Sequence, residues 1–211
     1  MANPFFGYVH LFSFVVPAAV GIWVYARLNR GMRLLVVLCI LACANVGLQF
    51  GLSLWRITNY IVADCYRVVE VSLITGVLYL SSTLERARLV ITCIGVIFAL
   101  IWIGDMAWLN DHDHINSGMA MISRMFLIVM SLITLYAEVM SERSNLAERS
   151  VFWISVGVAL YSSGTLLAVA SSNYLLGLRR AYFDVAWHFN WGLLVVANLM
   201  YTKGIMCKPQ V

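Results

Sequence analysis

Long apolar stretches, one after another, constrain this chain more than any other feature of its sequence. Seven of them are long enough to cross a bilayer as helices, which takes about 20 residues each. They cover residues 5–26, 34–55, 58–81, 87–109, 117–140, 150–176 and 183–206. Because 62% of the residues are hydrophobic and only 11% are charged, an ordinary soluble domain is excluded. We therefore expect an all-α polytopic membrane protein, with a single seven-helix transmembrane bundle over residues 1–211.

The distribution of basic residues predicts the orientation of this bundle. Lysine and arginine in short loops are retained on the cytoplasmic side of a membrane. With the amino terminus outside, the outer loops hold only Arg56, Arg179 and Arg180. The cytoplasmic side then holds Arg27, Arg30, Arg33, Arg86, Arg88, Arg143, Arg149, Lys203 and Lys208. We expect an outer amino terminus and a cytoplasmic carboxyl terminus, and the net charge of +4 needs no nucleic-acid partner to explain it.

The third stretch, TNYIVADCYRVVEVSLITGVLYLS, carries three charged residues at membrane depth. Each of Asp64, Arg67 and Glu70 costs roughly 2.5 to 3.5 kcal/mol at the centre of a membrane helix, so they need partners or water. Their spacing places them within an arc of about 120° on one helical face. Two interpretations remain open: an internal salt bridge that pins the bundle, or a ligand or ion site in a water-filled cavity.

Further polar residues are expected near these charges. Arg124 lies about seven residues into the fifth stretch, near the depth of Asp64, and is too deep to reach the interface easily. It is expected to face the bundle, as the partner of a carboxylate or as an anion contact. His188 is either a core histidine or a ligand contact with a proton-linked role. Glu138 lies near the cytoplasmic end and is expected to be solvated.

Most of these polar residues fall in the outer half of the predicted bundle. The set consists of His10, Gln49, Asp64, Arg67, Asp105, Arg124, His188 and Asn190. The inner half has little comparable, so we expect a polar cavity between the third, fifth and seventh helices that opens outward. Four aromatic side chains are predicted to surround this cavity: Tyr60, Trp102, Trp187 and Trp191. The predicted ligand contacts are Gln49, Tyr60, Asp64, Arg67, Glu70, Arg124, Trp187, His188 and Asn190.

No catalytic residue, metal site or resident cofactor is predicted. The loop sequence NDHDHINS holds Asp111, His112, Asp113 and His114, but adjacent residues in a loop lack fixed ligand geometry, so a solvated outer loop is expected. His10 and the histidine of the last helix leave a bis-histidine haem open as an alternative.

A pair of glycines in the second stretch suggests close helix packing. Gly47 and Gly51 form a small-xxx-small pair, which lets another backbone approach. Packing within the bundle is the favoured interpretation, because six other helices are at hand. A homodimer contact is the alternative.

Three stretches carry a resemblance to known proteins: TNYIVADCYRVVEVSLITGVLY, FWISVGVALYSSGTLL and AWHFNWGLLVVANLMYTKGIMC. These stretches resemble small seven-helix membrane proteins of bacteria and, more loosely, the seven-helix sensor modules of histidine kinases. The matching positions are Asn59, Tyr60, Glu70, Phe152, Trp153, Gly164, Trp187, His188 and Asn190. The resemblance implies a multi-pass protein of the bacterial inner membrane, without a kinase domain in this chain.

Together these features predict a receptor or sensor. It would bind a small polar or anionic ligand in its outer cavity and pass occupancy to a signalling partner in the cytoplasm or the membrane. The lipid bilayer and the small molecule are its other expected partners. A small-molecule transporter, and an intramembrane enzyme that modifies lipid or depends on a metal, remain alternatives.

Overall fold

The computed structural model describes residues 4–55, 60–108, 117–141, 145–178 and 180–207. It describes the backbone alone for residues 4–11, 53, 60, 61, 106–108, 117, 173, 176, 178 and 180. Long α-helices fill these ranges, and the ranges contain no β-strand. The predicted all-α class is therefore confirmed for the described part of the chain.

Each predicted apolar stretch corresponds to one long helix. The helices are α1 Pro4–Val24, α2 Arg30–Leu54, α3 Tyr60–Ser81, α4 Glu85–Trp108, α5 Ser117–Met140, α6 Ser150–Leu178 and α7 Arg180–Met206. Two short 3₁₀ turns, η1 Tyr25–Arg27 and η2 Leu146–Glu148, precede α2 and α6. The boundaries of α5 agree with the prediction at both ends.

The start of α2 differs from the prediction because of a capping residue. The apolar pattern placed its beginning at residue 34, but the helix begins four positions earlier, at Arg30. Asn29 precedes it, and the Asn29 Oδ1 accepts a hydrogen bond from the Met32 backbone N–H at 2.9 Å. Asparagine is a preferred N-cap because its side chain binds backbone N–H groups that have no partner within the helix. The helix therefore extends into the polar loop.

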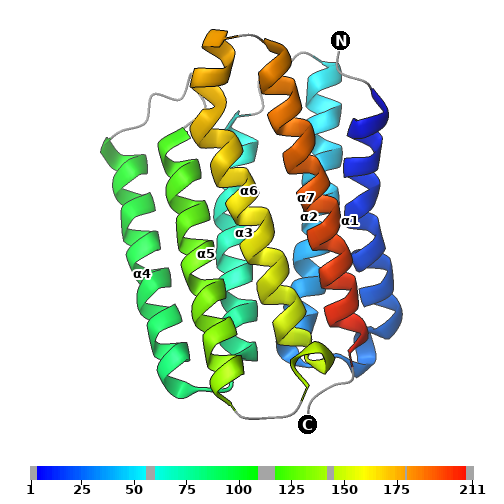
Figure 1. Cartoon of the computed structure of the whole chain (residues 1–211), viewed down its shortest axis with the longest axis vertical. Helices are drawn as coiled ribbons and strands as arrows, with labels where there is room; N and C mark the ends of the chain where they lie inside the picture. The colour runs from blue at the N-terminus through cyan, green and yellow to red at the C-terminus, as the bar shows by residue number, and fades with distance from the viewer. Residues whose placement is uncertain (1–3, 56–59, 109–116, 142–144, 179, 208–211) are drawn as a thin grey trace.

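Six of the helices form a closed ring, and α4 lies outside it. Contacts join α1 to α2, α2 to α3, α3 to α5, α5 to α6, α6 to α7, and α7 back to α1. Helix α4 packs against α3 and α5 from outside and lies at one edge of the bundle (Figure 1). The first and last helices are thus neighbours, although α1 begins and α7 ends at opposite ends of the bundle (Figure 1).

The surface of this bundle is apolar, as a membrane requires. Within the described ranges, four helices, α2, α4, α5 and α6, have the length and hydropathy of a membrane span. Trp23, Trp55 and Leu89 are among the large apolar side chains left exposed, at 85%, 80% and 66%. Exposed apolar patches of this extent mark contact with lipid or protein. These observations indicate a membrane-associated helical bundle.

The glycine pair of α2 does not make the predicted contact inside the bundle. A Cβ atom added at Gly47 or Gly51 would meet nothing within 4 Å among the described residues. Close packing occurs instead at Gly157 of α6, where an added Cβ would lie 2.8 Å from the Tyr201 ring of α7. The predicted close packing at the α2 pair is therefore not found among the described residues.

Candidate functional site

A buried ion pair between α3 and α5 lies at the centre of the candidate site. Arg124 donates from Nη1 to Glu70 Oε1 at 2.9 Å and from Nη2 to Glu70 Oε2 at 2.8 Å. Both side chains are about nine-tenths buried. The Arg124 guanidinium also lies over the ring of Tyr161 on α6, 5.0 Å from its centroid, which is the geometry of a cation–π contact. The prediction that Arg124 faces the bundle and meets a carboxylate is confirmed.

The ion pair borders a cavity of about 210 Å³ inside the ring. Its walls come from α1, α2, α3, α5 and α6, and they combine charged, amide and aromatic groups. The lining residues are Phe14, Ala42, Asn45, Val46, Gln49, Ala63, Tyr66, Arg67, Glu70, Arg124 and Tyr161. At about 30 Å³ per molecule of liquid water, the volume suits about seven waters or a small organic molecule. We refer to it as the polar cavity.

Arg67 belongs to a second ion pair on α3. Its Nη1 lies 2.8 Å from Asp64 Oδ1, one helical turn away, while Glu70 binds Arg124. The expected core of Asp64, Arg67 and Glu70 is therefore divided into two pairs. The division follows from geometry, because an arginine fork matches a carboxylate best when both oxygens are reached, and Arg124 approaches Glu70 from the facing helix.

Two amides of α2 complete the polar wall. Gln49 Nε2 donates to Asn45 Oδ1 at 3.2 Å, one turn away on the same helix. The structure thus brings together four of the predicted contacts: Gln49, Arg67, Glu70 and Arg124. Asp64 is connected to them by its ion pair with Arg67. Asn45 lines the polar cavity as well, although it is not among the predicted contacts.

The predicted contacts on α7 lie elsewhere. Asn190 Oδ1 accepts a hydrogen bond from the Thr165 hydroxyl of α6 at 3.1 Å. His188 uses Nδ1 to bind the Asp184 backbone oxygen of its own helix, and its ring packs against Trp191. None of Trp187, His188 and Asn190 lines the polar cavity. The expectation of a cavity shared by α3, α5 and α7 was wrong for α7, because residues of α1, α2 and α6 supply the remaining walls.

The aromatic wall also differs from the prediction. Phe14, Tyr66 and Tyr161 line the polar cavity, rather than the predicted tryptophans. Trp102 lines a separate groove between α3 and α4. Tyr66 was recoverable from the sequence, because it is adjacent to Arg67 and one turn before Glu70 on the same face. The predicted contact Tyr60, together with His10, has no described side chain, and the DHDH loop lies outside the described residues.

A second buried ion pair lies near the opposite end of α5. Arg149 Nη1 donates to Glu138 Oε2 at 2.7 Å, to the Glu138 backbone oxygen at 3.2 Å and to Ser141 Oγ at 2.7 Å. The Thr83 hydroxyl, in the α3–α4 connection, donates to Glu138 Oε1 at 3.4 Å. Glu138 is only 1% exposed. The expectation that Glu138 is solvated was wrong, because Arg149, directly before α6, forms an ion pair with it.

A layer of mostly apolar, fully buried side chains separates the Glu70–Arg124 pair from the Glu138–Arg149 pair. On α3 it contains Ile74 and Leu78, on α5 Leu127 and Met130, and on α6 Val158. All are 3% exposed or less. Arg124 and Glu138 are 14 positions apart on α5, about 21 Å at 1.5 Å per residue. The expectation that the inner half holds little polar chemistry was wrong, although its ion pair is sealed from the polar cavity.

Among the described residues, no three histidine, cysteine or carboxylate side chains cluster in a way that could hold a metal ion. The polar cavity is lined by two guanidinium groups, a carboxylate, two amides and two phenol rings. Such a set can orient a small molecule by hydrogen bonds and charge. These features define a helical membrane bundle with an internal polar cavity.

Comparison with known proteins adds no family to this description. No protein-family model, curated protein or solved structure matches the chain. The resemblance to seven-helix sensor modules therefore stays a prediction.

Proposed function

We propose that this protein is a seven-span receptor or sensor of the bacterial inner membrane, which binds a small polar or anionic ligand in the polar cavity. The observation that carries the proposal is the cavity itself, about 210 Å³ of space where charged and amide side chains meet inside the ring. Protein interiors are otherwise close-packed, so ion pairs that served stability alone would not need this volume. The space is available for a ligand.

The available cation of the cavity is Arg67. Glu70 and Arg124 satisfy each other through two hydrogen bonds. Arg67 uses only Nη1 for Asp64, and its Nε and Nη2 have no partner among the described residues. The Nε–Nη2 edge of a guanidinium matches the two oxygens of a carboxylate. A ligand with one carboxylate would therefore bind this edge, with its apolar part against Phe14.

Exposure of the charged side chains suggests the direction of entry. It rises along α3 from 9% at Glu70 to 14% at Arg67 and 25% at Asp64. The accessible end is the amino-terminal end of α3. In the proposed orientation, with an outer amino terminus, this end faces away from the cytoplasm. The ligand would then come from outside.

The apolar layer favours sensing over transport. Alternating access would have to hydrate Leu127, Met130 and Val158, which are 1% exposed or less and lie between the two ion pairs. A sensor needs no such route. Helix α5 carries one member of the Glu70–Arg124 pair and one of the Glu138–Arg149 pair, so a shift of α5 at the polar cavity would reach Glu138 and the α3–α4 connection. We propose this helix as the element that reports occupancy to a signalling partner.

Binding of benzoate and of its neutral isostere benzamide, measured by calorimetry on protein in lipid nanodiscs, tests the proposal. We expect benzoate to bind, and to bind at least tenfold more tightly than benzamide. Ala63→Leu should abolish binding, since Ala63 lines the cavity. Ala44→Leu is the matched control, because Ala44 is exposed on α2.

Charge variants then test the role of the arginine. Arg67→Gln should remove the preference for benzoate. Asp64→Asn should tighten benzoate binding several-fold, because it removes a like charge close to the incoming carboxylate. If the two leucine variants bind both probes like the unaltered protein, the cavity is not the site. If liposomes containing the protein take up benzoate at a steady rate, transport replaces sensing as the function.

A further inference from the structure

A groove of about 680 Å³ lies between α3 and α4, separate from the polar cavity. It lies where α4 packs outside the ring (Figure 1). Its walls are mostly apolar, with several small residues. The lining residues are Val68, Val71, Ser72, Thr75, Gly76, Tyr79, Thr92, Gly95, Val96, Phe98, Ala99, Trp102 and Ile103.

Small side chains on both helices keep this groove open. Ser72 and Gly76 lie one turn apart on α3, and Gly95 and Ala99 lie one turn apart on α4. The helices touch at Gly95, where an added Cβ would lie 3.3 Å from Thr75 Cγ2. The hollow is therefore bounded by fixed contacts, and its width is set by the absence of larger side chains.

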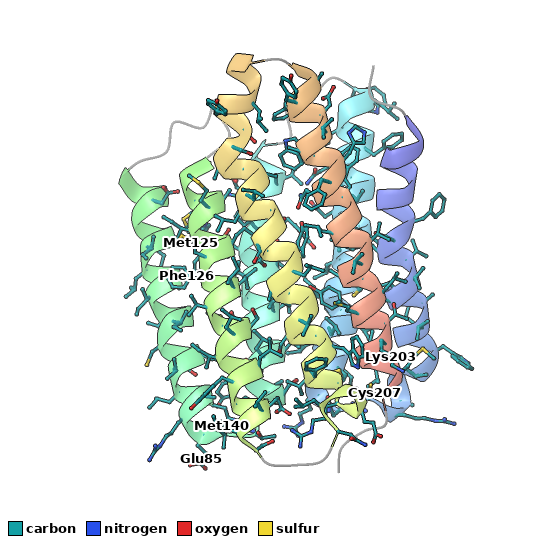
Figure 2. All side chains as sticks on the ribbon, viewed as in Figure 1. Glu85, Met125, Phe126, Met140, Lys203 and Cys207 are labelled. Carbon is teal, nitrogen blue, oxygen red and sulfur yellow. The ribbon has the colours of Figure 1, made fainter. Side chains whose placement is uncertain are left out.

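Phe98 fixes the position of α4 beside the groove. It is 4% exposed, and its ring meets the Phe126 ring of α5 edge to face with centroids 5.5 Å apart. Aromatic pairs in this geometry add about 0.5 to 1.5 kcal/mol beyond the area they bury. Figure 2 shows Phe126 on α5, the helix that holds α4 from the other side. The groove is thus a built feature of the α3–α4–α5 packing.

A cation is held at one end of the groove. Arg88 donates from Nε to the Ser82 backbone oxygen at 3.0 Å. Its guanidinium carbon lies 5.9 Å from the centroid of the Tyr79 ring, which lines the groove. The two Nη groups of Arg88 have no partner among the described residues. Nearby, Glu85 and Arg86 are both exposed, and no described ion pair joins them to Arg88.

The dimensions of the groove match one leaflet of a membrane. Arg88 and Ile103 are 15 positions apart on α4, which is about 22 Å along the helix at 1.5 Å per residue. A bilayer with its headgroups is about 40 to 45 Å thick, so one lipid spans about the same distance. The cation lies at the end nearest the α3–α4 connection, and the apolar part extends from it toward the middle of the bundle.

We infer that this groove binds an anionic phospholipid, with one acyl chain between α3 and α4 and the phosphate at the Nη groups of Arg88. The apolar walls suit the chain and the held guanidinium suits the phosphate. The lipid fills the groove between α3 and α4 and so contacts both helices. This inference depends on the membrane environment and not on ligand binding in the polar cavity.

Native mass spectrometry of the detergent-purified protein tests this site. The protein is incubated with equal amounts of phosphatidylglycerol and phosphatidylcholine that carry the same acyl chains. We expect one retained lipid per chain, with phosphatidylglycerol favoured at least fivefold. Ala99→Phe should lower this occupancy at least fivefold, because it fills the groove. Leu100→Phe, at the next position and 64% exposed, is the matched control.

The headgroup contact has its own pair of variants. Arg88→Gln should leave a lipid bound but equalise the two headgroups, whereas Arg86→Gln should leave the preference unchanged. Equal retention by the Ala99→Phe and Leu100→Phe variants would overturn the inference, as would the absence of a headgroup preference in the unaltered protein. Crosslinking of the groove to a second copy or to a partner helix, with no lipid retained, would assign it to that occupant instead.

Discussion

Arg124 and Glu70 are 54 positions apart in sequence and join α5 to α3. The two Nη groups of the arginine donate to the two carboxylate oxygens of the glutamate. Such a pair has little tolerance for the loss of one member. The remaining charge would stay buried without a counter-charge, although the intact pair adds little net stability over a well-packed apolar pair. The ion pair therefore fixes the position of α3 relative to α5 more than it adds to the free energy of their association.

Removal of one member of this pair should be strongly destabilising. Arg124→Met, which leaves Glu70 unpaired, is expected to cost about 3 to 5 kcal/mol. The double variant, with Glu70→Met added, should recover most of that loss, because no buried charge remains. Unfolding of the purified protein in mixed detergent measures both. A double variant no more stable than the single one would contradict the assignment.

The two ion pairs should contribute independently to stability. Glu70→Gln and Glu138→Gln act on separate pairs, whose α5 members Arg124 and Glu138 are about 21 Å apart along the helix, so their effects are expected to add within about 0.5 kcal/mol. The double variant and both single variants are compared by the same unfolding measurement. A larger interaction free energy would show that the two pairs are coupled across the apolar layer without ligand.

Two glycines should respond in opposite ways to the same substitution. Gly157→Ala places a methyl group against the rigid Tyr201 ring and is expected to cost about 1 to 3 kcal/mol. Gly47→Ala meets nothing within 4 Å and should be neutral or stabilise by up to about 1 kcal/mol, since alanine favours helix. If Gly47→Ala destabilised the protein in a concentration-dependent way, α2 would be a contact between copies.

Labelling of Cys207 should report the orientation of the bundle. This thiol lies just after α7, and Figure 2 shows it at the same end as Met140 and Glu85. In the proposed orientation, a membrane-impermeant maleimide should label it in inverted vesicles and not in intact cells. A Cys207→Ser variant identifies labelling at other cysteines. Labelling in intact cells alone would reverse the orientation.

The pH dependence of this labelling follows from the same site. Burial raises the pKa of the Cys207 thiol, and Lys203 partly opposes that rise. The thiolate is the reactive form, so less of it is present at neutral pH than for a free cysteine. The labelling rate should therefore increase by roughly tenfold per pH unit while the pH stays below the raised pKa. A rate independent of pH between 6.5 and 8.5 would contradict the buried environment.

The helices were predictable because their signal is local. Apolar stretches of membrane length identify them without knowledge of neighbours, and α5 shows this at both ends. The start of α2 was missed because Asn29, a polar residue outside the apolar pattern, decides it. The inward direction of Arg124 was also predictable, since a guanidinium at that depth has no low-cost alternative.

Partners across the bundle were not predictable from the same pattern. Depth placed Arg124, Asp64 and His188 at a similar level, but depth does not say which helices are adjacent. The ring order places α2 beside α3, so Asn45 joins the cavity and His188 does not. Glu138 was misjudged for a related reason: its partner Arg149 lies beyond a turn and was assigned to the solvated loops.

The closure of the ring between α1 and α7 has a consequence for biogenesis. The seam between them includes the bond from Asn198 Nδ2 to Ser13 Oγ, at 2.9 Å, between residues 185 positions apart. In the proposed seven-span arrangement, a chain that enters the membrane in order has already inserted α1 to α6 before this contact can form. Synthesis of the last helix therefore completes the enclosure, and every shorter nascent chain leaves the polar interior open on one side.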